Sequence, residues 1–425
     1  MSEITQNNTR TKELIEIEDR YGAHNYHPLP VVLEKGEGVY LWDVEGKKYL
    51  DFLSAYSAVN QGHCHPRIIG ALSEQAKKLT LTSRAFHSDQ LGAFCKYAGE
   101  LFGYDRVIMM NSGVEAVETA IKLCRKWGYL VKGIDQGAAK IVFANNNFHG
   151  RTLGVVSAST DESARKDFGP FLPGILNVPY DDLSALEELF VRESSIAGFI
   201  VEPIQGEAGV VLPSEGYLQG VRDLCSKFKV LYIADEIQTG IARTGSMLAS
   251  YDIDDPDRKS VQPDILLLGK AISGGVMPIS AVLANDEVML TLKPGEHGST
   301  FGGNPLACAV AKEALSVVLD EALSSNALKM GQLFRDGLVE LSAKHPLIKL
   351  VRGKGLLNAI VIDSDEDSLL AWNICMTFKE NGLLAKPTHG NKIRLAPPLV
   401  ITEEQVSDAL SIIDKSFQVT ANLQS

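Results

Sequence analysis

The fold is decided by the stretch Pro263-Asp-Ile-Leu-Leu-Leu-Gly-Lys-Ala-Ile-Ser-Gly-Gly-Val-Met-Pro-Ile-Ser-Ala-Val282. Its first apolar run, Ile265 to Leu268, has the length of a buried strand, and Gly269 and Lys270 follow at once. A lysine held against packed apolar residues is partly desolvated, which lowers its pKa. The neutral amine that results can attack a carbonyl group and form a Schiff base. The alternative is a lysine that lies in solvent at a strand end, as most lysines do.

Short apolar runs and helical stretches alternate on both sides of this stretch. The other runs of strand length cover residues 106–110, 141–144, 198–201, 230–234 and 279–283. Parallel strands that are buried on both faces have continuous apolar sequences. The alternation therefore predicts an α/β fold with a largely parallel sheet that helices cover on both faces. After about Pro305, longer helical stretches and short strands predict a smaller α+β domain.

Length, charge and cysteine usage limit the class of protein. A chain of 425 residues fits two or three domains. The net charge of −12 argues against nucleic acids or anionic membranes as partners, and no apolar run approaches the roughly 18 residues of a membrane helix. The first twenty residues are too acidic for a transit peptide, and the six cysteines lack paired spacing. We therefore expect a cytoplasmic protein with reduced thiols.

A second candidate residue, Asp235, ends the apolar run Val230-Leu-Tyr-Ile-Ala-Asp-Glu236. Ligands bind at the carboxyl ends of strands in open α/β sheets, where a carboxylate would keep an aromatic nitrogen heterocycle protonated. The alternative is a nucleotidase in which the acids hold magnesium. That class needs a Gly-x-x-x-x-Gly-Lys-Ser/Thr loop, but alanine follows Lys270. The segment His63-Cys64-His65 has no second ligand cluster at metal-binding spacing, so we predict no metal site.

Two polar, glycine-containing segments could bind phosphate. Asn111-Ser112-Gly113-Val114 lies between a predicted strand and a predicted helix. Free N–H groups at a helix N-terminus bind phosphate well, although asparagine and serine are also ordinary helix caps. Gly298-Ser-Thr-Phe-Gly-Gly-Asn304 offers hydroxyl groups for the same purpose, and its alternative is a flexible turn.

Two arginines are candidates for carboxylate binding. Arg151 follows a predicted strand in Phe148-His-Gly-Arg-Thr152, and it could hold a carboxylate through two parallel hydrogen bonds. Phe148 could stack on a planar cofactor, or it could pack in the core. Arg394 is flanked by apolar residues, and a buried arginine needs a partner, for which Glu207 is a candidate.

Several motifs together resemble the class III aminotransferases, which use pyridoxal phosphate. They are Gly22–Pro28, Ser57–His63, Val201–Gly209, Asp235–Gly240, Leu268–Gly275, His297–Thr300 and Leu384–His389. The resemblance runs from about Tyr21 to the last predicted helix, and one departure is a long segment at residues 251–262. It implies fold type I, with a mainly parallel seven-stranded sheet in a large domain. The implied division is an N-terminal segment 1–57, a large cofactor-binding domain 58–305 and a small α+β domain 306–425.

The resemblance also implies a role for individual residues toward the cofactor. Lys270 would bind pyridoxal phosphate covalently and move protons, and Asp235 would pair with the pyridine nitrogen. The other implied cofactor contacts are Gly113 and Val114 to the phosphate, Phe148 to the ring, Gln238 near the ring hydroxyl, and Thr300 of the partner subunit to the phosphate. The implied assembly is a homodimer or a higher homo-oligomer with shared active sites.

On the substrate side, the resemblance implies transfer of the δ-amino group of L-ornithine to 2-oxoglutarate. The products would be glutamate 5-semialdehyde and glutamate, in proline biosynthesis or arginine catabolism. Tyr26 and Arg151 would hold the α-amino acid end of ornithine, and Tyr56 would line the pocket. Glu207 and Arg394 would form a pair that distinguishes the two substrates. The alternatives are family members that act on acetylornithine, 4-aminobutyrate or lysine, and a scaffold without catalytic activity.

Overall fold

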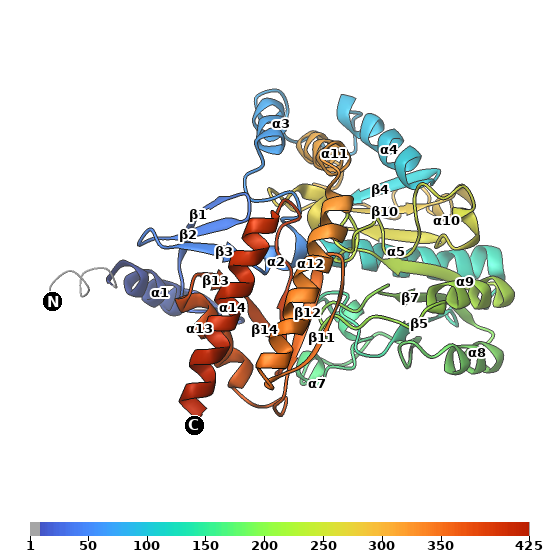
Figure 1. The fold of residues 1–425 in the computed structure, drawn as a ribbon. Helices are drawn as coiled ribbons and strands as arrows, with labels where there is room; N and C mark the ends of the chain where they lie inside the picture. Colours follow the sequence, from blue (N-terminus) through green and yellow to red (C-terminus); the bar gives the residue numbers. More distant parts are fainter. Residues whose placement is uncertain (1–8, 425) are drawn as a thin grey trace.

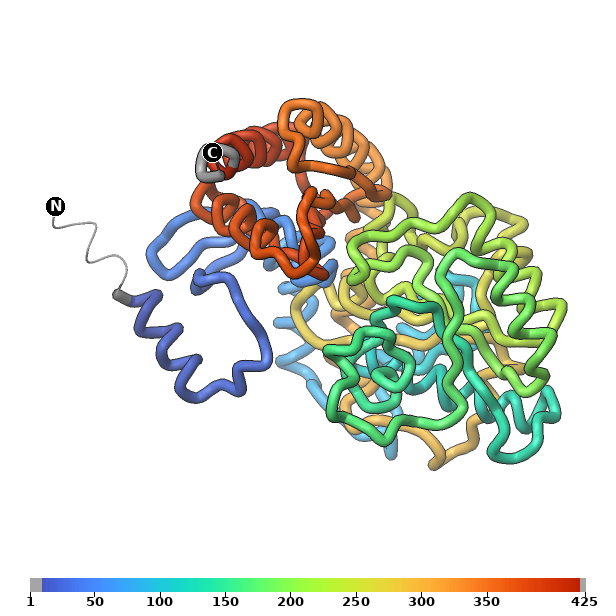
Figure 2. Tube along the Cα trace, turned by 90° about the horizontal axis from the view of Figure 1, so that it is seen from below, coloured from blue at the N-terminus to red at the C-terminus, as the bar shows by residue number. Residues whose placement is uncertain are grey.

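The structure is a computed structural model that describes residues 9–424. Residues 1–8 and 425 lie outside the described residues, and with them the start of the segment predicted for residues 1–57. Figures 1 and 2 show two lobes, one formed by green and yellow segments around a large sheet and one covered by the orange and red C-terminal helices. Helix α1 (Thr9–Tyr21) lies at the edge of the molecule in both views.

The large sheet has seven strands in the order β4-β10-β9-β8-β7-β5-β6. Their bounds are β4 (Arg106–Met110), β10 (Ser280–Ala284), β9 (Ile265–Leu268), β8 (Leu231–Asp235), β7 (Ile196–Val201), β5 (Lys140–Ala144) and β6 (Ile175–Val178). Neighbouring strands from β9 to β6 pair in parallel, whereas β10 is antiparallel to both of its neighbours. The predicted mainly parallel, seven-stranded sheet is therefore confirmed.

Helices cover both faces of this sheet. Successive side chains of a strand point to opposite faces, so the apolar side chains of each face pack against a different set of helices. Ile200 and Ile233 belong to a core cluster with α5 (Gly113–Trp127). The adjacent Phe199 and Tyr232 belong to another cluster, which includes residues of α8 (Leu183–Arg192) and α9 (Tyr217–Phe228). Burial on both faces explains why these strands have continuous apolar sequences.

A further cluster continues this core toward the ends of the chain. It packs β9 and β10 against α3 (Pro66–Ala76), α4 (Asp89–Phe102) and α11 (Pro305–Asp320), and it extends to α12 (Leu323–Lys344), α13 (Leu370–Glu380) and α14 (Glu403–Gln424). The other helical elements are α2 (Ser54–Ser57), η1 (Gly128–Lys132), α6 (Leu153–Val156), α7 (Glu162–Arg165), η2 (Arg258–Ser260), η3 (Lys270–Ser273) and α10 (Asp286–Met289). None of the helices within residues 9–424 has the length and apolar character needed to cross a membrane.

Two four-stranded sheets form the second lobe. One has the order β1-β2-β3-β13 and the other the order β11-β12-β15-β14. Their bounds are β1 (Leu33–Glu37), β2 (Tyr40–Asp43), β3 (Lys48–Asp51), β13 (Leu383–Leu384), β11 (Ile348–Lys354), β12 (Leu357–Ile362), β15 (Lys392–Leu395) and β14 (Lys386–Thr388). Leu50 of β3 pairs with Leu383 of β13, so residues from both ends of the chain share one sheet.

Candidate active site

The candidate site lies where strands of the large sheet end. Strand β8 ends at Asp235, β9 is followed by Gly269 and Lys270, and α5 begins at Gly113 after β4. Carboxyl ends of parallel strands share one edge of a sheet, which is where ligands bind in this fold class. A cavity of about 240 Å³ opens there, lined by Gly113, Val114, Phe148, Asp235, Gln238 and Lys270 among others. The structure thus brings these six predicted residues together.

Lys270 is not a lysine that lies in solvent at a strand end. Its side chain lines the cavity, and its backbone is left-handed with φ 46°, a conformation that is uncommon outside glycine and that clusters at functional sites. Burial lowers the pKa of Lys270 from 10.5 to about 8, although the charges of Glu207 and Asp235 oppose this effect. At pH 7 about a tenth of the amine is therefore unprotonated, far more than for a lysine with the ordinary pKa, and this fraction is able to act as a nucleophile or base.

Asp235 is held by a histidine that the sequence did not single out. Its Oδ2 lies 2.6 Å from Nδ1 of His149, and its Oδ1 accepts a hydrogen bond of 3.1 Å from the N–H of Ile237. Burial disfavours a charged His149, but the hydrogen bond and charge of Asp235 outweigh burial and raise the histidine pKa. The two hydrogen bonds fix the position of the Asp235 carboxylate beside the cavity. His149 was visible only as the neighbour of Phe148, because its contact with Asp235 spans 86 residues.

A buried glutamate, Glu202, contacts the backbone next to His149. Glu202 is 6% exposed, and its carboxylate accepts a hydrogen bond of 3.1 Å from the N–H of Phe148. Burial raises the pKa of Glu202 to about 7, while the charge of His149 works in the opposite direction. The contact holds the backbone of Phe148, whose ring forms part of the cavity wall.

The N-terminus of α5 forms another part of the cavity wall. Ser112 caps this helix, and its Oγ accepts a hydrogen bond of 3.3 Å from the N–H of Glu115, whose carboxylate in turn accepts the N–H of Ser112 at 2.7 Å. A Cβ at Gly113 would lie 3.0 Å from the side chain of Ile237, so this position has little space for a larger residue. The free N–H groups and the helix dipole favour an anion at this end.

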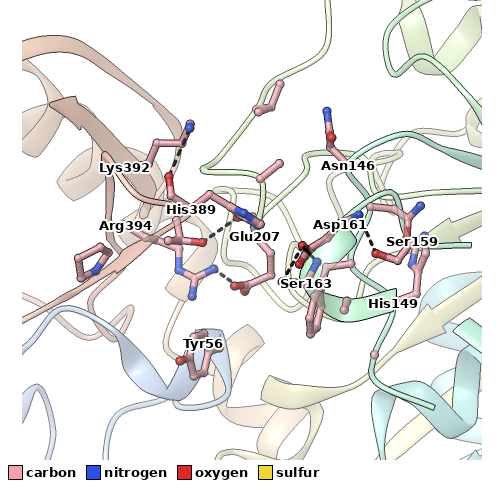
Figure 3. A pocket seen from close by; sticks show the side chains of 18 of the residues that line it. Tyr56, Asn146, His149, Ser159, Asp161, Ser163, Glu207, His389, Lys392 and Arg394 are labelled. Carbon is pink, nitrogen blue, oxygen red and sulfur yellow. Dashed lines mark hydrogen bonds and ion pairs between the residues drawn. The ribbon is translucent and has the colours of Figure 1, made fainter. Parts of the chain in front are cut away.

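A buried ion pair lies between the two lobes. Nη1 of Arg394 is 2.6 Å from Oε1 of Glu207, and Arg394 is only 2% exposed. Gln238 bridges the pair, since its Nε2 donates to Glu207 at 2.9 Å and its Oε1 accepts from Arg394 at 3.2 Å. Although burial opposes ionisation, the charges of Arg394 and Lys270 and these hydrogen bonds lower the pKa of Glu207 to about 2. Figure 3 shows the pair, with Tyr56 beside the guanidinium.

A larger cavity of about 730 Å³ adjoins the first. Phe148, Arg151 and Glu207 line both cavities, and Tyr56 and Arg394 line the larger one. The guanidinium carbon of Arg394 is 4.9 Å from the centroid of the Tyr56 ring, and that of Arg151 is 5.1 Å from the Phe148 ring. Cationic groups therefore stand at two places in one continuous space, so a molecule with a charged group at each end could be held between them.

Residues 21–417 match the sequence model of the family Aminotransferase class-III. The chain belongs to the class III aminotransferases. It is 61% identical to the mitochondrial ornithine aminotransferase of Drosophila melanogaster, over 94% of this chain and 90% of the relative. The solved ornithine aminotransferase of Toxoplasma gondii ME49 matches with a TM-score of 0.92 and 50% identity, over 97% of this chain and 96% of the other. An acetylornithine aminotransferase from Elizabethkingia anophelis matches with a TM-score of 0.86 and 57% identity, over 96% and 99%.

The site of this class III aminotransferase fits pyridoxal phosphate. The cofactor carries an aldehyde, a ring nitrogen and a phosphate. The cavity offers an amine with a lowered pKa at Lys270, a buried carboxylate at Asp235 and a helix N-terminus at Gly113. Each of these three groups therefore has a counterpart in the cavity wall.

Two predicted residues lie elsewhere in this class III aminotransferase. Tyr26 is 73% exposed and Thr300 is also exposed, and within the described chain neither side chain lines one of the two cavities. Their contacts with substrate and cofactor stay predictions.

The histidines of the segment His63-Cys64-His65 pair with acidic side chains, His63 with Asp51 at 2.7 Å and His65 with Glu321 at 3.0 Å. In residues 9–424, no group of three or more His, Cys, Asp or Glu residues could hold a metal ion.

Proposed function

We propose that this enzyme transfers the δ-amino group of L-ornithine to 2-oxoglutarate, giving glutamate 5-semialdehyde and glutamate. The observation that carries the proposal is the closed Glu207–Arg394 pair beside Lys270. An ordinary α-amino acid donor would need Arg394 free to bind the carboxylate next to its reacting carbon. Ornithine reacts at its far amine, so for this donor Arg394 has to be neutralised. The names of the relatives agree with the proposal.

The residues around the cavity can each carry one part of the reaction. Bound pyridoxal phosphate supplies an aldehyde that condenses with amines and a ring that accepts electrons. Lys270 would take a proton from the reacting carbon of the substrate and deliver it to the cofactor, a type of step that contributes about 10²–10⁴-fold. Asp235, which is hydrogen-bonded to His149, would place its carboxylate beside the ring nitrogen and favour the protonated form of that nitrogen. Phe148 would cover the ring, and Gln238 would lie near the ring hydroxyl.

The two substrates are distinguished at the two cationic ends of the cavity. Arg151, with Tyr26, holds the α-carboxylate and α-amino group of ornithine away from the reacting centre. Tyr56 lines the same cavity as Arg151 and Arg394. During this half-reaction Glu207 occupies Arg394. In the second half-reaction, 2-oxoglutarate brings its α-carboxylate to Arg394, and Glu207 has to release the arginine. The pair thus works as a switch between the two half-reactions.

Assembly and cellular setting are part of the same proposal. We propose a homodimer or a higher homo-oligomer in which Thr300 reaches the phosphate of the neighbouring active site, and the exposed Phe301 next to it supports a contact there. The division at residues 57 and 305, the pathways of proline biosynthesis or arginine catabolism and the cytoplasmic location stay predictions. The relative from Drosophila melanogaster is named as mitochondrial.

A panel of amino donors tests the proposed function. The purified enzyme, loaded with pyridoxal phosphate, is assayed with 2-oxoglutarate and ornithine, acetylornithine, 4-aminobutyrate or lysine. Ornithine is expected to give the highest kcat/KM, because an acetyl group removes the free amine that Tyr26 is proposed to bind. The second candidate donor is acetylornithine, since the relative from Elizabethkingia anophelis bears that name. An equal or higher kcat/KM with acetylornithine would overturn the proposal in favour of that candidate.

A further inference from the structure

Glu207 lies in a turn formed by residues 206–209. This turn packs tightly against Gln238, which follows strand β8 of the large sheet. A Cβ at Gly206 would lie 1.6 Å from Oε1 of Gln238, so the glutamine side chain packs directly on the turn backbone. The N–H groups of Gly209 and Val210 both donate to the carbonyl of Gly206 at 3.2 Å. The turn is therefore closed on itself and seated on Gln238.

The other lobe holds the same turn by its backbone. The hydroxyl of Thr388 donates to the carbonyl of Glu207 at 2.7 Å, and Nε of Arg352 donates to the carbonyl of Gly209 at 2.8 Å. Gly209 has φ +98°, and a Cβ there would lie 2.5 Å from Cδ of Lys392. Both hydrogen bonds are accepted by neutral carbonyl groups rather than by the carboxylate of Glu207. These contacts therefore fix the position of the turn backbone and leave the charge of the Glu207 carboxylate to its pairing with Arg394.

All these donors come from one sheet, the same sheet that carries Arg394. Arg352 lies on β11, Arg394 on β15 and Thr388 on β14. Strand β14 pairs directly with β15, with Thr388 opposite Lys392 and Lys386 opposite Arg394. The sheet thus contacts the turn three times, twice at its backbone and once at the carboxylate of Glu207.

We propose that Thr388 and Arg352 are positioning residues that set the preference between ornithine and dicarboxylate substrates. They hold the backbone of Glu207 at the place where its carboxylate meets Arg394. The backbone of the turn is therefore already in the conformation that the closed pair requires. Opening then proceeds by rotation of the Glu207 side chain alone, while the turn stays in place. The inference rests on the proposed function, because it assigns these residues to the switch between the two half-reactions.

Loss of one of these hydrogen bonds is expected to disfavour the closed state of the Glu207–Arg394 pair, because only the closed state needs the backbone of Glu207 in a fixed position. The closed pair depends on one carboxylate position, whereas the open state only needs the carboxylate to be elsewhere. When the turn has lost one hydrogen bond, the closed state of the pair is less populated. The kcat/KM for ornithine then falls, and a substrate carboxylate binds Arg394 more tightly. One hydrogen bond of this kind corresponds to a shift of about fivefold, or about 1 kcal/mol at 1.36 kcal/mol per tenfold.

The test uses Thr388→Val, which removes the hydroxyl and keeps the shape, and Thr388→Ser, which restores the hydroxyl. Arg352→Met is a second, independent variant that keeps the apolar stem of the side chain. Thr377→Val is the matched control, because Thr377 also donates to a carbonyl, that of Asn373 at 3.0 Å within α13. Its hydroxyl contacts neither the turn nor the ion pair.

Two quantities are measured on the loaded enzymes. One is the ratio of kcat/KM for ornithine to kcat/KM for glutamate, and the other is the Kd of glutarate, a dicarboxylate without an amino or keto group, by calorimetry. In Thr388→Val and Arg352→Met the ratio is expected to fall about fivefold and glutarate to bind about fivefold more tightly. Thr388→Ser is expected to recover both values, and Thr377→Val to match the wild type.

The outcomes separate this inference from the proposed function. If both donors lose efficiency equally in Thr388→Val, or neither quantity changes, the positioning role is wrong. If Thr388→Ser behaves like Thr388→Val, the hydroxyl is not the group that matters and the role is equally wrong. A wild-type enzyme that does not use ornithine contradicts the proposed function itself, and this is seen before any variant is compared.

Discussion

Removal of the Glu207 carboxylate is the most informative single perturbation of the ion pair. The pKa of Glu207 is lowered from 4.5 to about 2, a difference that corresponds to about 3 kcal/mol in favour of the ionised, paired form. In Glu207→Ala this stabilisation is lost, and Arg394, at 2% exposure, is left buried without its carboxylate. A substrate carboxylate next to the reacting carbon then takes its place. The ratio of kcat/KM for ornithine to that for glutamate is therefore expected to fall roughly hundredfold.

The assay compares half-reactions of the loaded enzyme with each donor under the same conditions. Glu207→Gln keeps the size of the side chain and is expected to shift the ratio in the same direction, because it also lacks the charge. Asp363→Ala is the control, since Asp363 pairs with Lys349 at 2.9 Å in an exposed ion pair that contributes little. If Glu207→Ala lowers both donors by the same factor, or leaves the ratio unchanged, the reasoning about the pair is refuted.

Three further predictions concern Lys270 and Arg151. Lys270→Ala is expected to lose the visible absorbance of the lysine-bound cofactor together with turnover, and normal turnover would contradict its role. In the cofactor-free protein, covalent capture of pyridoxal phosphate should accelerate from pH 7 to 9 with a midpoint near 8, because only the neutral amine attacks; a midpoint near the ordinary 10.5 would show that burial does not lower the lysine pKa. Arg151→Ala should raise the KM for ornithine roughly tenfold or more and the KM for 2-oxoglutarate far less, as judged by steady-state kinetics, and equal effects would count against its role.

Local sequence placed Asp235 and Lys270 at the ends of predicted strands, whereas their roles were assigned by the resemblance to the class III aminotransferases. The apolar runs before Asp235 and Lys270 are buried on both faces, which makes them recognisable without any knowledge of their neighbours. The helix that begins at Gly113 was equally visible, because its cap and its periodicity are local. The shared edge of a parallel sheet then brings these three positions together by topology alone.

Contacts between distant segments were not predictable in the same way. The hydrogen bond from His149 to Asp235 joins two segments through the fold, and neither segment contains a signal for the other. Gln238 was expected near the ring hydroxyl, yet its amide also bridges Glu207 and Arg394, which depends on the space beside Gly206. The antiparallel direction of β10 also depends on its neighbours, since its apolar sequence is the same in either direction.

The most direct test of the central claim is the origin of the transferred nitrogen. The wild-type enzyme is incubated with 2-oxoglutarate and ornithine that carries ¹⁵N either at the δ-amine or at the α-amine, and glutamate is analysed by mass spectrometry. The closed Glu207–Arg394 pair predicts that δ-labelled ornithine yields labelled glutamate and α-labelled ornithine yields unlabelled glutamate. Transfer of the α-label would contradict the assignment of the switch, and with it the proposed function.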